Sequence, residues 1–212
     1  MPEITPKTKA KPQQLRAEIT ASNIVETTLY LTEVDKISLD KISMLDVAKK
    51  SGYSVGAVYR YFKDKNDILN KIFGFYLGKI HRTCVEKLES FPDSGNCRQL
   101  AILIVDHYLE DLKHRNINNV LILYKIFMQN VSRPEQVSSA VDVLIAPIHN
   151  IMLNDKTGTF KTPNINEIKI NLRGLSYMMR STYLEQNPYG FTSEYREFLI
   201  ENCTLLFGNA HH

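Results

Sequence analysis

Residues 44–62 read MLDVAKKSGYSVGAVYRYF, and the fold of the chain follows from this stretch. A helix-turn-helix packs two short helices at a steep angle. It therefore needs a small residue in the first helix, a residue tolerant of positive φ in the turn, and an aliphatic residue on the inner face of the second helix. Ala48, Gly52 and Val58 occupy these three places. The stretch predicts a helix-turn-helix whose second helix would lie in the major groove of DNA.

Two serines mark where the helices of this motif begin. Ser43 and Asp46 form the S-x-x-D pattern of a capping box, and Ser54 stands at the N-cap position of the second helix. Any helical hairpin with a glycine turn shares the small-glycine-aliphatic spacing, so the spacing alone leaves a plain hairpin as the alternative. The flanking residues favour the DNA-binding interpretation.

The run 52–62, with Val47-Ala48 before it and Lys65 after it, resembles the DNA-binding head of the TetR family. The resemblance covers about a quarter of the chain, and the length and the order of the expected helices also fit. It implies an all-helical homodimer, most often a repressor, that a small molecule releases from a palindromic DNA operator. The connector before the motif, residues 35–42, departs from the family because it lacks the usual glycine.

The candidate DNA contacts each have a physical reason. Hydroxyl and free N–H groups at the two helix starts can bind phosphate oxygens. Gly56 lets the second helix approach DNA closely, its apolar neighbours suit thymine methyl groups, and Arg60 suits a guanine edge or a phosphate. The alternative for Tyr59 is a place in the core, and for Lys65 an ordinary place on a helix surface. The expected DNA-contacting residues are Ser43, Ser54, Val55, Gly56, Ala57, Tyr59, Arg60, Tyr61 and Lys65.

Composition and proline spacing predict an all-α chain. The 212 residues are 43% apolar and 23% charged, and no proline occurs between Pro12 and Pro92. Apolar residues recur at helical spacing, and Pro147 is expected to kink the helix that contains it. About nine helices are expected, at roughly 15–34, 43–51, 54–62, 65–88, 98–115, 118–130, 132–153, 164–186 and 192–207.

Charge is distributed as a DNA-binding head at the front of the chain requires. Residues 1–82 hold 14 Lys and Arg against 9 Asp and Glu, whereas residues 83–212 hold 12 against 14. Lys7, Lys9 and Lys11 can reach along the DNA backbone or into a minor groove. The expected domains are a flexible basic arm (1–14), a helix-turn-helix head (15–64) and a helical body for ligand binding and dimerisation (65–208).

Cysteine usage and hydropathy indicate a cytoplasmic protein. Cys84, Cys97 and Cys203 are odd in number and have no C-x-x-C spacing, which fits buried, reduced thiols. No apolar run reaches the ~18–20 residues of a membrane span, and the polar N-terminus does not have the pattern of a secretory signal.

The last two expected helices are apolar on more than one side, so one face can pack on the body and another on a partner. In the TetR family the corresponding helices form the four-helix interface of a dimer. A deeply buried helix in a monomer is the alternative. The expected dimer-interface residues are Leu172, Leu175, Met179, Phe198, Leu199 and Leu206.

The expected helices of the body contain aromatic and methionine residues, some of which end in a polar group. Such side chains suit a pocket for an unknown, largely apolar effector. The alternative for each is an ordinary place in the core. Gly74 and Gly78 fit either the close approach of a neighbouring helix or a bendable joint between head and body. The expected ligand-binding residues are His107, Tyr108, Tyr124, Met128, His149 and Tyr177.

Other classes of function have weaker support. The sequence has no catalytic or dinucleotide-binding motif, so neither an enzyme nor a cofactor is expected. His107 and His114, with His81 or His149, could bind a metal, but solvated or core histidines are the simpler explanation and no metal is expected. The remaining alternative is an architectural or protein-binding helix-turn-helix module, which would need no cavity for a ligand.

Overall fold

The structure is a computed structural model that describes residues 12–113, 115, 117–130 and 139–209. In these ranges it contains nine α-helices, two short 3-10 helices and no strand, so the all-α prediction is confirmed. An isolated bridge joins Phe160 to Gly208. The expected basic arm with Lys7, Lys9 and Lys11 lies outside the described residues.

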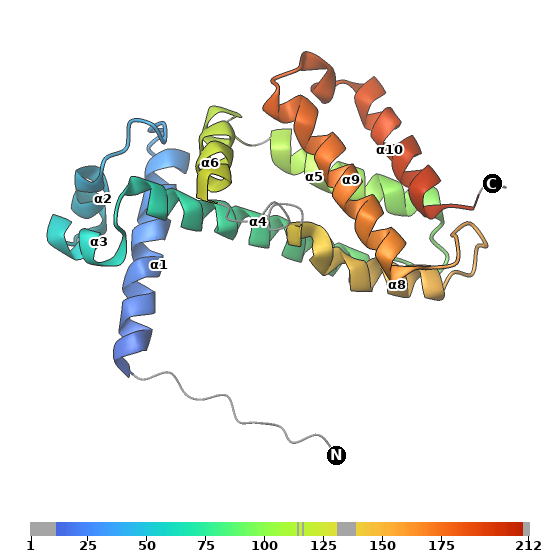
Figure 1. The fold of residues 1–212 in the computed structure, drawn as a ribbon, viewed down its shortest axis with the longest axis horizontal. Helices are drawn as coiled ribbons and strands as arrows, with labels where there is room; N and C mark the ends of the chain where they lie inside the picture. The colour runs from blue at the N-terminus through green and yellow to red at the C-terminus, as the bar shows by residue number, and fades with distance from the viewer. Residues whose placement is uncertain (1–11, 114, 116, 131–138, 210–212) are drawn as a thin grey trace. The chain divides into compact units, whose positions relative to one another are not determined.

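The chain forms two compact units, the head (Met1–Phe73) and the body (Gly74–His212). The boundary lies inside a continuous helix, later than the expected one before Lys65, so the first turns of that helix belong to the head. The head contains α1 (Pro12–Glu33), α2 (Met44–Ser51), α3 (Val55–Tyr61) and the start of α4 (Lys65–Glu89) (Figure 1). Pro12 is the first residue of α1, where a missing N–H breaks no helical hydrogen bond.

The core of the head forms where α1, α2 and α3 pack on the first turns of α4. Ile24 and Val58 are fully buried, as are Ile68 and Leu69 of α4. The connector also contributes, because Leu39 is only 2% exposed. The buried side chains explain why short helices are stable here, since isolated helices of this length are marginal in water.

A lysine has a positive φ in the connector between α1 and α2. Lys36 has φ 56°, in the left-handed region that most residues avoid. Its neighbours hold it there, because the amide of Ile37 donates a hydrogen bond to the carbonyl oxygen of Leu31 (3.0 Å).

The body contains the rest of α4 and seven further helical segments. Three of its helices, α5, α9 and α10, lie side by side, with α10 packed on both others (Figure 1). The segments after α4 are α5 (Cys97–Lys113), α6 (Ile117–Asn130), η1 (Ser139–Leu144), α8 (Ile145–Leu153), α9 (Ile165–Leu184), η2 (Pro188–Phe191) and α10 (Ser193–Phe207).

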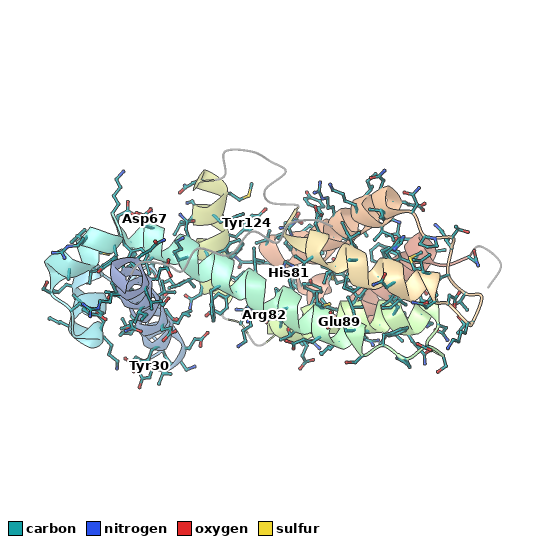
Figure 2. All side chains as sticks on the ribbon, turned by 90° about the horizontal axis from the view of Figure 1, so that it is seen from below. Tyr30, Asp67, His81, Arg82, Glu89 and Tyr124 are labelled. Atoms are coloured by element: carbon teal, nitrogen blue, oxygen red, sulfur yellow. The ribbon has the colours of Figure 1, made fainter. Side chains whose placement is uncertain are left out.

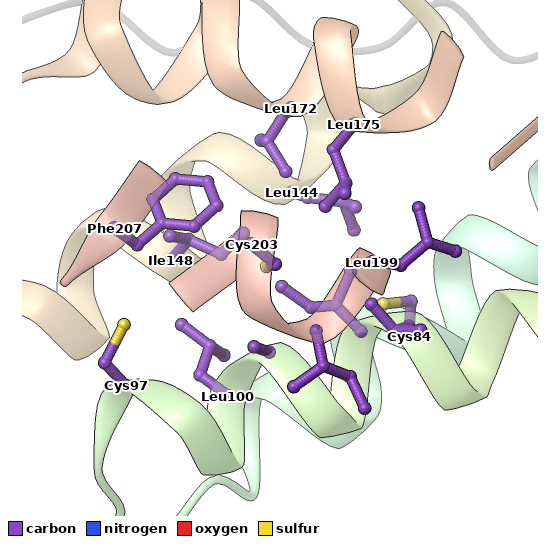
Figure 3. Packing of buried hydrophobic residues seen from close by; sticks show 14 of the residues in the cluster. Cys84, Cys97, Leu100, Leu144, Ile148, Leu172, Leu175, Leu199, Cys203 and Phe207 are labelled. Atoms are coloured by element: carbon purple, nitrogen blue, oxygen red, sulfur yellow. The ribbon is translucent and has the colours of Figure 1, made fainter. Parts of the chain in front are cut away.

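One apolar cluster holds the body together. Leu100 of α5, Leu175 of α9 and Leu199 of α10 are each 0% exposed and face one another in the cluster (Figure 3). Cys84 and Cys97 are free thiols in this cluster, and burial raises the pKa of each to about 12. Since the thiolate is the reactive form, these thiols are unreactive at neutral pH.

Two expectations about the helices need correction or lie outside the described residues. Pro147 does not kink a long helix: it stands in the first turn of α8, after the 3-10 segment η1, where proline is tolerated. The start expected for that helix, near residue 132, is outside the described residues. Within the described ranges, no helix is both long and apolar enough to cross a membrane.

Candidate functional site

The helix-turn-helix forms as its caps predict. The hydroxyl of Ser43 accepts a hydrogen bond from the amide of Asp46 (3.2 Å), and the carboxylate of Asp46 accepts one from the amide of Ser43 (2.9 Å). Gly52 ends α2 with φ 76°, and the hydroxyl of Ser54 accepts from the amide of Ala57 (3.1 Å). The capping box, the turn glycine and the second N-cap are therefore confirmed.

The helix α3 presents an outward face that the head does not cover. Val58 and Phe62 point inward and are 0% and 4% exposed. Tyr59, by contrast, is 52% exposed, and Arg60 and Gly56 are exposed as well. Of the other expected DNA contacts, the two cap serines are exposed, and Val55, Ala57 and Tyr61 are partly exposed. The core alternative for Tyr59 does not hold, and the space beside Gly56 is open.

Lys65 is the exception among the expected DNA contacts. Its ammonium donates hydrogen bonds to the carbonyl oxygens of Leu39 (3.2 Å) and Asp40 (2.9 Å), and the side chain is partly buried. The phosphate contact stays a prediction, and this lysine also uses its charge to hold the connector against the start of α4. The nearby Lys63 is exposed, and the described residues offer its side chain no hydrogen-bond or ion-pair partner.

Replacing Lys65 is therefore expected to destabilise the head. Lys65→Met removes two hydrogen bonds from a charged donor and should lower the free energy of unfolding by about 1–2 kcal/mol. Urea unfolding followed by circular dichroism measures the loss, and Lys63→Met, which removes an equal charge, should leave stability unchanged. If Lys65→Met had wild-type stability but bound DNA more weakly, the result would support a phosphate contact for Lys65 and not a structural role.

A cluster of aromatic and imidazole rings lies inside the body. The rings of His81 and Tyr108 have centroids 5.8 Å apart, and those of His107 and Tyr108 are 5.4 Å apart. The Nε2 of His107 donates to the carbonyl oxygen of Ile80 (2.8 Å), whereas the buried hydroxyl of Tyr108 has no hydrogen-bond partner among the described residues. Figure 2 shows His81 on α4 and Tyr124 on α6. The cluster thus holds unused hydrogen-bonding capacity.

Burial and nearby charge keep this cluster neutral. Burial, His107 and Arg180 together lower the pKa of His81 to about 4. Burial also lowers the pKa of His107 and raises that of Tyr108. At neutral pH, both imidazoles and the phenol are therefore uncharged hydrogen-bonding groups.

The buried imidazole predicts a pH-dependent stability. Because the pKa of His81 is about 4 in the folded chain and near 6.5 in the unfolded chain, only the unfolded chain takes up the proton between these values. Its contribution to stability is complete above pH 6.5 and is lost as the pH falls, by about 2 kcal/mol at pH 5. Thermal unfolding of His81→Gln should show a smaller decrease between neutral pH and pH 5. An equal decrease in wild type and variant would contradict a buried, neutral His81.

The structure brings together some of the expected ligand-binding residues. His107 and Tyr108 lie in the ring cluster. Met128 and Tyr177 are instead 43% and 68% exposed, and His149 is partly buried on α8.

Sequence reasoning named His81 as a possible metal ligand but did not place it in this ring cluster. A signal for His81 existed, because it precedes Cys84 and Leu88 by three and seven residues and so falls on a buried stripe of α4. In the described ranges, no group of three or more His, Cys, Asp or Glu side chains could hold a metal ion. His114, which the metal hypothesis used, lies outside those ranges.

Two open crevices on the body lie apart from the ring cluster. One, of about 380 Å³, is bounded by Asp106, Met179 and Arg196 among others, and the other, of about 260 Å³, by Phe91, Pro147 and Asp155 among others. Ion pairs border both: Arg196 pairs with Asp106 (2.5 Å), and Lys156 with Asp93 (2.5 Å).

Most residues expected at a dimer interface belong to the chain's own core. Leu172, Leu175, Met179 and Leu199 are at most 5% exposed and pack in the apolar cluster. They leave little surface for a partner, and a role for them at an interface stays a prediction. Leu206 is partly buried and Phe198 is 44% exposed. The exposed apolar residues of α9 and α10 are Ile165, Ile170, Tyr177, Phe198 and Leu205.

Comparison with known proteins agrees with the helix-turn-helix geometry. Residues 38–72 match the family model described as "Bacterial regulatory proteins, tetR family". The HTH-type transcriptional regulator BetI of Klebsiella pneumoniae (strain 342) is 22% identical over 80 residues, which are 38% of this chain and 41% of the relative. The match thus spans less than half the length of that relative.

Solved structures share the fold along nearly the whole chain. A putative transcriptional regulator from Saccharomonospora viridis, solved in complex with choline, superposes with a TM-score of 0.62 at 16% identity, covering 91% of this chain and 99% of that one. A putative TetR-family regulator from Mesorhizobium loti has a TM-score of 0.56 at 16% identity, with 92% and 99% covered. The matched head and the shared fold are thus similar to those of TetR-family helix-turn-helix regulators.

Proposed function

We propose that two copies of this chain bind a palindromic operator through α3 and leave it when a small molecule binds the body. The observation that carries the proposal is the outward face of α3, where Gly56, Tyr59 and Arg60 are exposed while Val58 and Phe62 anchor the helix. Because this regulator acts on DNA, we infer a cytoplasmic location for it.

The DNA contacts divide into two kinds. Tyr59 and Arg60 are exposed on α3 and would reach base edges, with Val55 and Ala57 against thymine methyl groups. The cap serines and Tyr61 would bind phosphates, which position the head without reading sequence. Lys63 is exposed and its side chain has no partner in the described residues, so it is a second candidate for a phosphate contact beside Lys65.

The exposed apolar residues of α9 and α10 support a dimer. Ile170 and Tyr177 stand one heptad apart on α9 and are 70% and 68% exposed, and Phe198 and Leu205 stand one heptad apart on α10. The two helices are held together by the hydrogen bond that the Asn171 amide donates to the carbonyl oxygen of Leu206 (3.0 Å). Such exposed apolar residues on neighbouring helices suit burial against a second copy.

The ring cluster of the body supports a ligand site. A buried phenol hydroxyl without a partner is unfavourable, and a bound ligand can satisfy it. The relative from Saccharomonospora viridis was solved with choline, so a protein of this fold can hold a small molecule. An effector that binds only the conformation unable to hold DNA would shift the population away from the operator.

Selection of DNA by the purified protein tests this function. Genomic fragments that the wild-type protein retains should share a palindrome, and a double variant with Tyr59→Ala and Arg60→Ala should not enrich it. Small molecules suggested by the neighbouring genes are then added to the complex, and release is followed by fluorescence anisotropy. Operator binding that no such molecule reverses would favour the architectural module, and failure to enrich any shared sequence would contradict a sequence-specific regulator.

A further inference from the structure

The larger of the two open crevices lies where α5, α9 and α10 meet in the body. Its volume of about 380 Å³ falls within the range of roughly 300–1,000 Å³ that is usual for small-molecule sites. Residues of all three helices line it, together with Gly190 of η2. A molecule bound in this crevice would therefore touch each of the three helices.

The inner wall of the crevice is apolar. Leu109 of α5 and Met179 of α9 line it and are only 9% and 5% exposed, because both also pack in the apolar cluster of the body. Leu112 lines it as well and packs against the same cluster. This wall is held in place by the core behind it, and it suits the apolar part of a ligand.

The charged side chains of the crevice include one cation that the described residues leave unpaired. Asp106 accepts hydrogen bonds from Nε (2.5 Å) and Nη2 (2.7 Å) of Arg196, and Glu110 also has an interaction within the chain. Lys113 is exposed in the last turn of α5, and the described residues offer its ammonium no hydrogen bond or ion pair. An anionic group beside Lys113 would supply the missing partner.

The crevice lies on the side of α10 away from the proposed dimer face. Arg196 lines the crevice and precedes Phe198 by two residues, which is about 200° around an α-helix. Leu205 follows Phe198 by one heptad and so shares its side of the helix. A ligand in the crevice would therefore not compete with a second copy of the chain.

We propose that this crevice binds a small amphipathic carboxylate, whose anionic group pairs with Lys113 while its apolar chain packs against Leu109 and Met179. The inference goes beyond the proposed function and does not depend on it. The rings of His81, His107 and Tyr108, which support the effector site proposed above, are not among the lining residues of the crevice.

Three probes of equal chain length and different charge test the proposal: octanoate, 1-octanol and octyltrimethylammonium. Each is titrated into full-length protein labelled at the methionine methyl groups, and the NMR signal of Met179 is assigned with Met179→Leu. Octanoate should shift the Met179 signal and leave that of Met44, in the head, unchanged. It should also bind about five-fold or more tightly than octyltrimethylammonium, because the two probes differ in the sign of the charge placed beside Lys113.

A variant tests the role of the lysine itself. Lys113→Met should weaken octanoate binding by about five-fold and leave 1-octanol binding unchanged, while Lys113→Arg, which keeps the charge, should bind octanoate nearly as the wild type does. The matched control is Lys125→Met, which removes an exposed lysine of α6 that does not line the crevice.

The outcomes separate this inference from the proposed function. A Met179 signal that millimolar octanoate does not shift, equal or tighter binding of octyltrimethylammonium, or octanoate binding that Lys113→Met leaves intact would each overturn the proposal. The comparison among probes needs only the wild-type protein, so it stands even if a variant fails to fold. Operator binding is measured separately without probes, and its failure counts against the regulator function alone.

Discussion

Replacing Leu205 with arginine is expected to convert the dimer to a monomer and to weaken operator binding by about a hundred- to ten-thousand-fold. Leu205 is 73% exposed on α10, so the substitution does not disturb the core of its own chain. In a two-fold dimer it would place two unpaired charges in an apolar interface. The loss is large because two linked heads bind DNA far more tightly than one.

Sedimentation equilibrium measures the mass of this variant, and fluorescence anisotropy with the selected operator measures its affinity. The matched control is Leu153→Arg, since Leu153 is 60% exposed at the end of α8 and belongs to neither helix of the proposed interface. A dimeric Leu205→Arg protein with wild-type operator affinity would show that the exposed residues of α10 do not form the interface.

Removing Arg60 is expected to weaken operator binding by about 1–3 kcal/mol per half-site, and by roughly twice that for a dimer on two half-sites. Arg60 is exposed on α3 and the described residues give it no ion pair, so Arg60→Ala should leave stability unchanged. Because a base contact carries sequence information, the variant should also discriminate less between the selected palindrome and its single-base changes.

Competition binding with a panel of single-base operator variants measures this loss of discrimination. Lys63→Ala is the control, because loss of a phosphate contact should weaken binding to all sequences alike and reduce its salt dependence. If Arg60→Ala bound the palindrome as tightly and selectively as wild type, α3 could still contact the DNA, but Arg60 would not recognise the base sequence.

The head could be predicted almost completely from its sequence because short-range rules determine it. Ser43, Gly52 and Ser54 each act on neighbours within a few residues, and their caps and turn form as expected. Lys65 could not be assigned in this way. Its partners are carbonyl oxygens 25 and 26 residues earlier in the chain, and nothing local indicates that the connector folds back to them.

The body was less predictable because the two apolar stripes of its helix α9 look alike in sequence. Periodicity identified both stripes of α9, but it cannot tell which one faces the chain's own core. Leu172 and Leu175 turned out to be internal, and Ile170 and Tyr177 external.

Site-specific cross-linking tests most directly whether α3 meets duplex DNA. Burial raises the pKa of Cys84 and Cys97 to about 12, so a cysteine introduced by Tyr59→Cys would be far more reactive than these native thiols. On an operator that carries a disulfide-activated base in the major groove, Tyr59→Cys should cross-link at two positions about one helical turn apart, as the two heads of a dimer require, while Leu153→Cys should not. Cross-linking of Leu153→Cys in place of Tyr59→Cys would show that another surface of the protein faces the DNA.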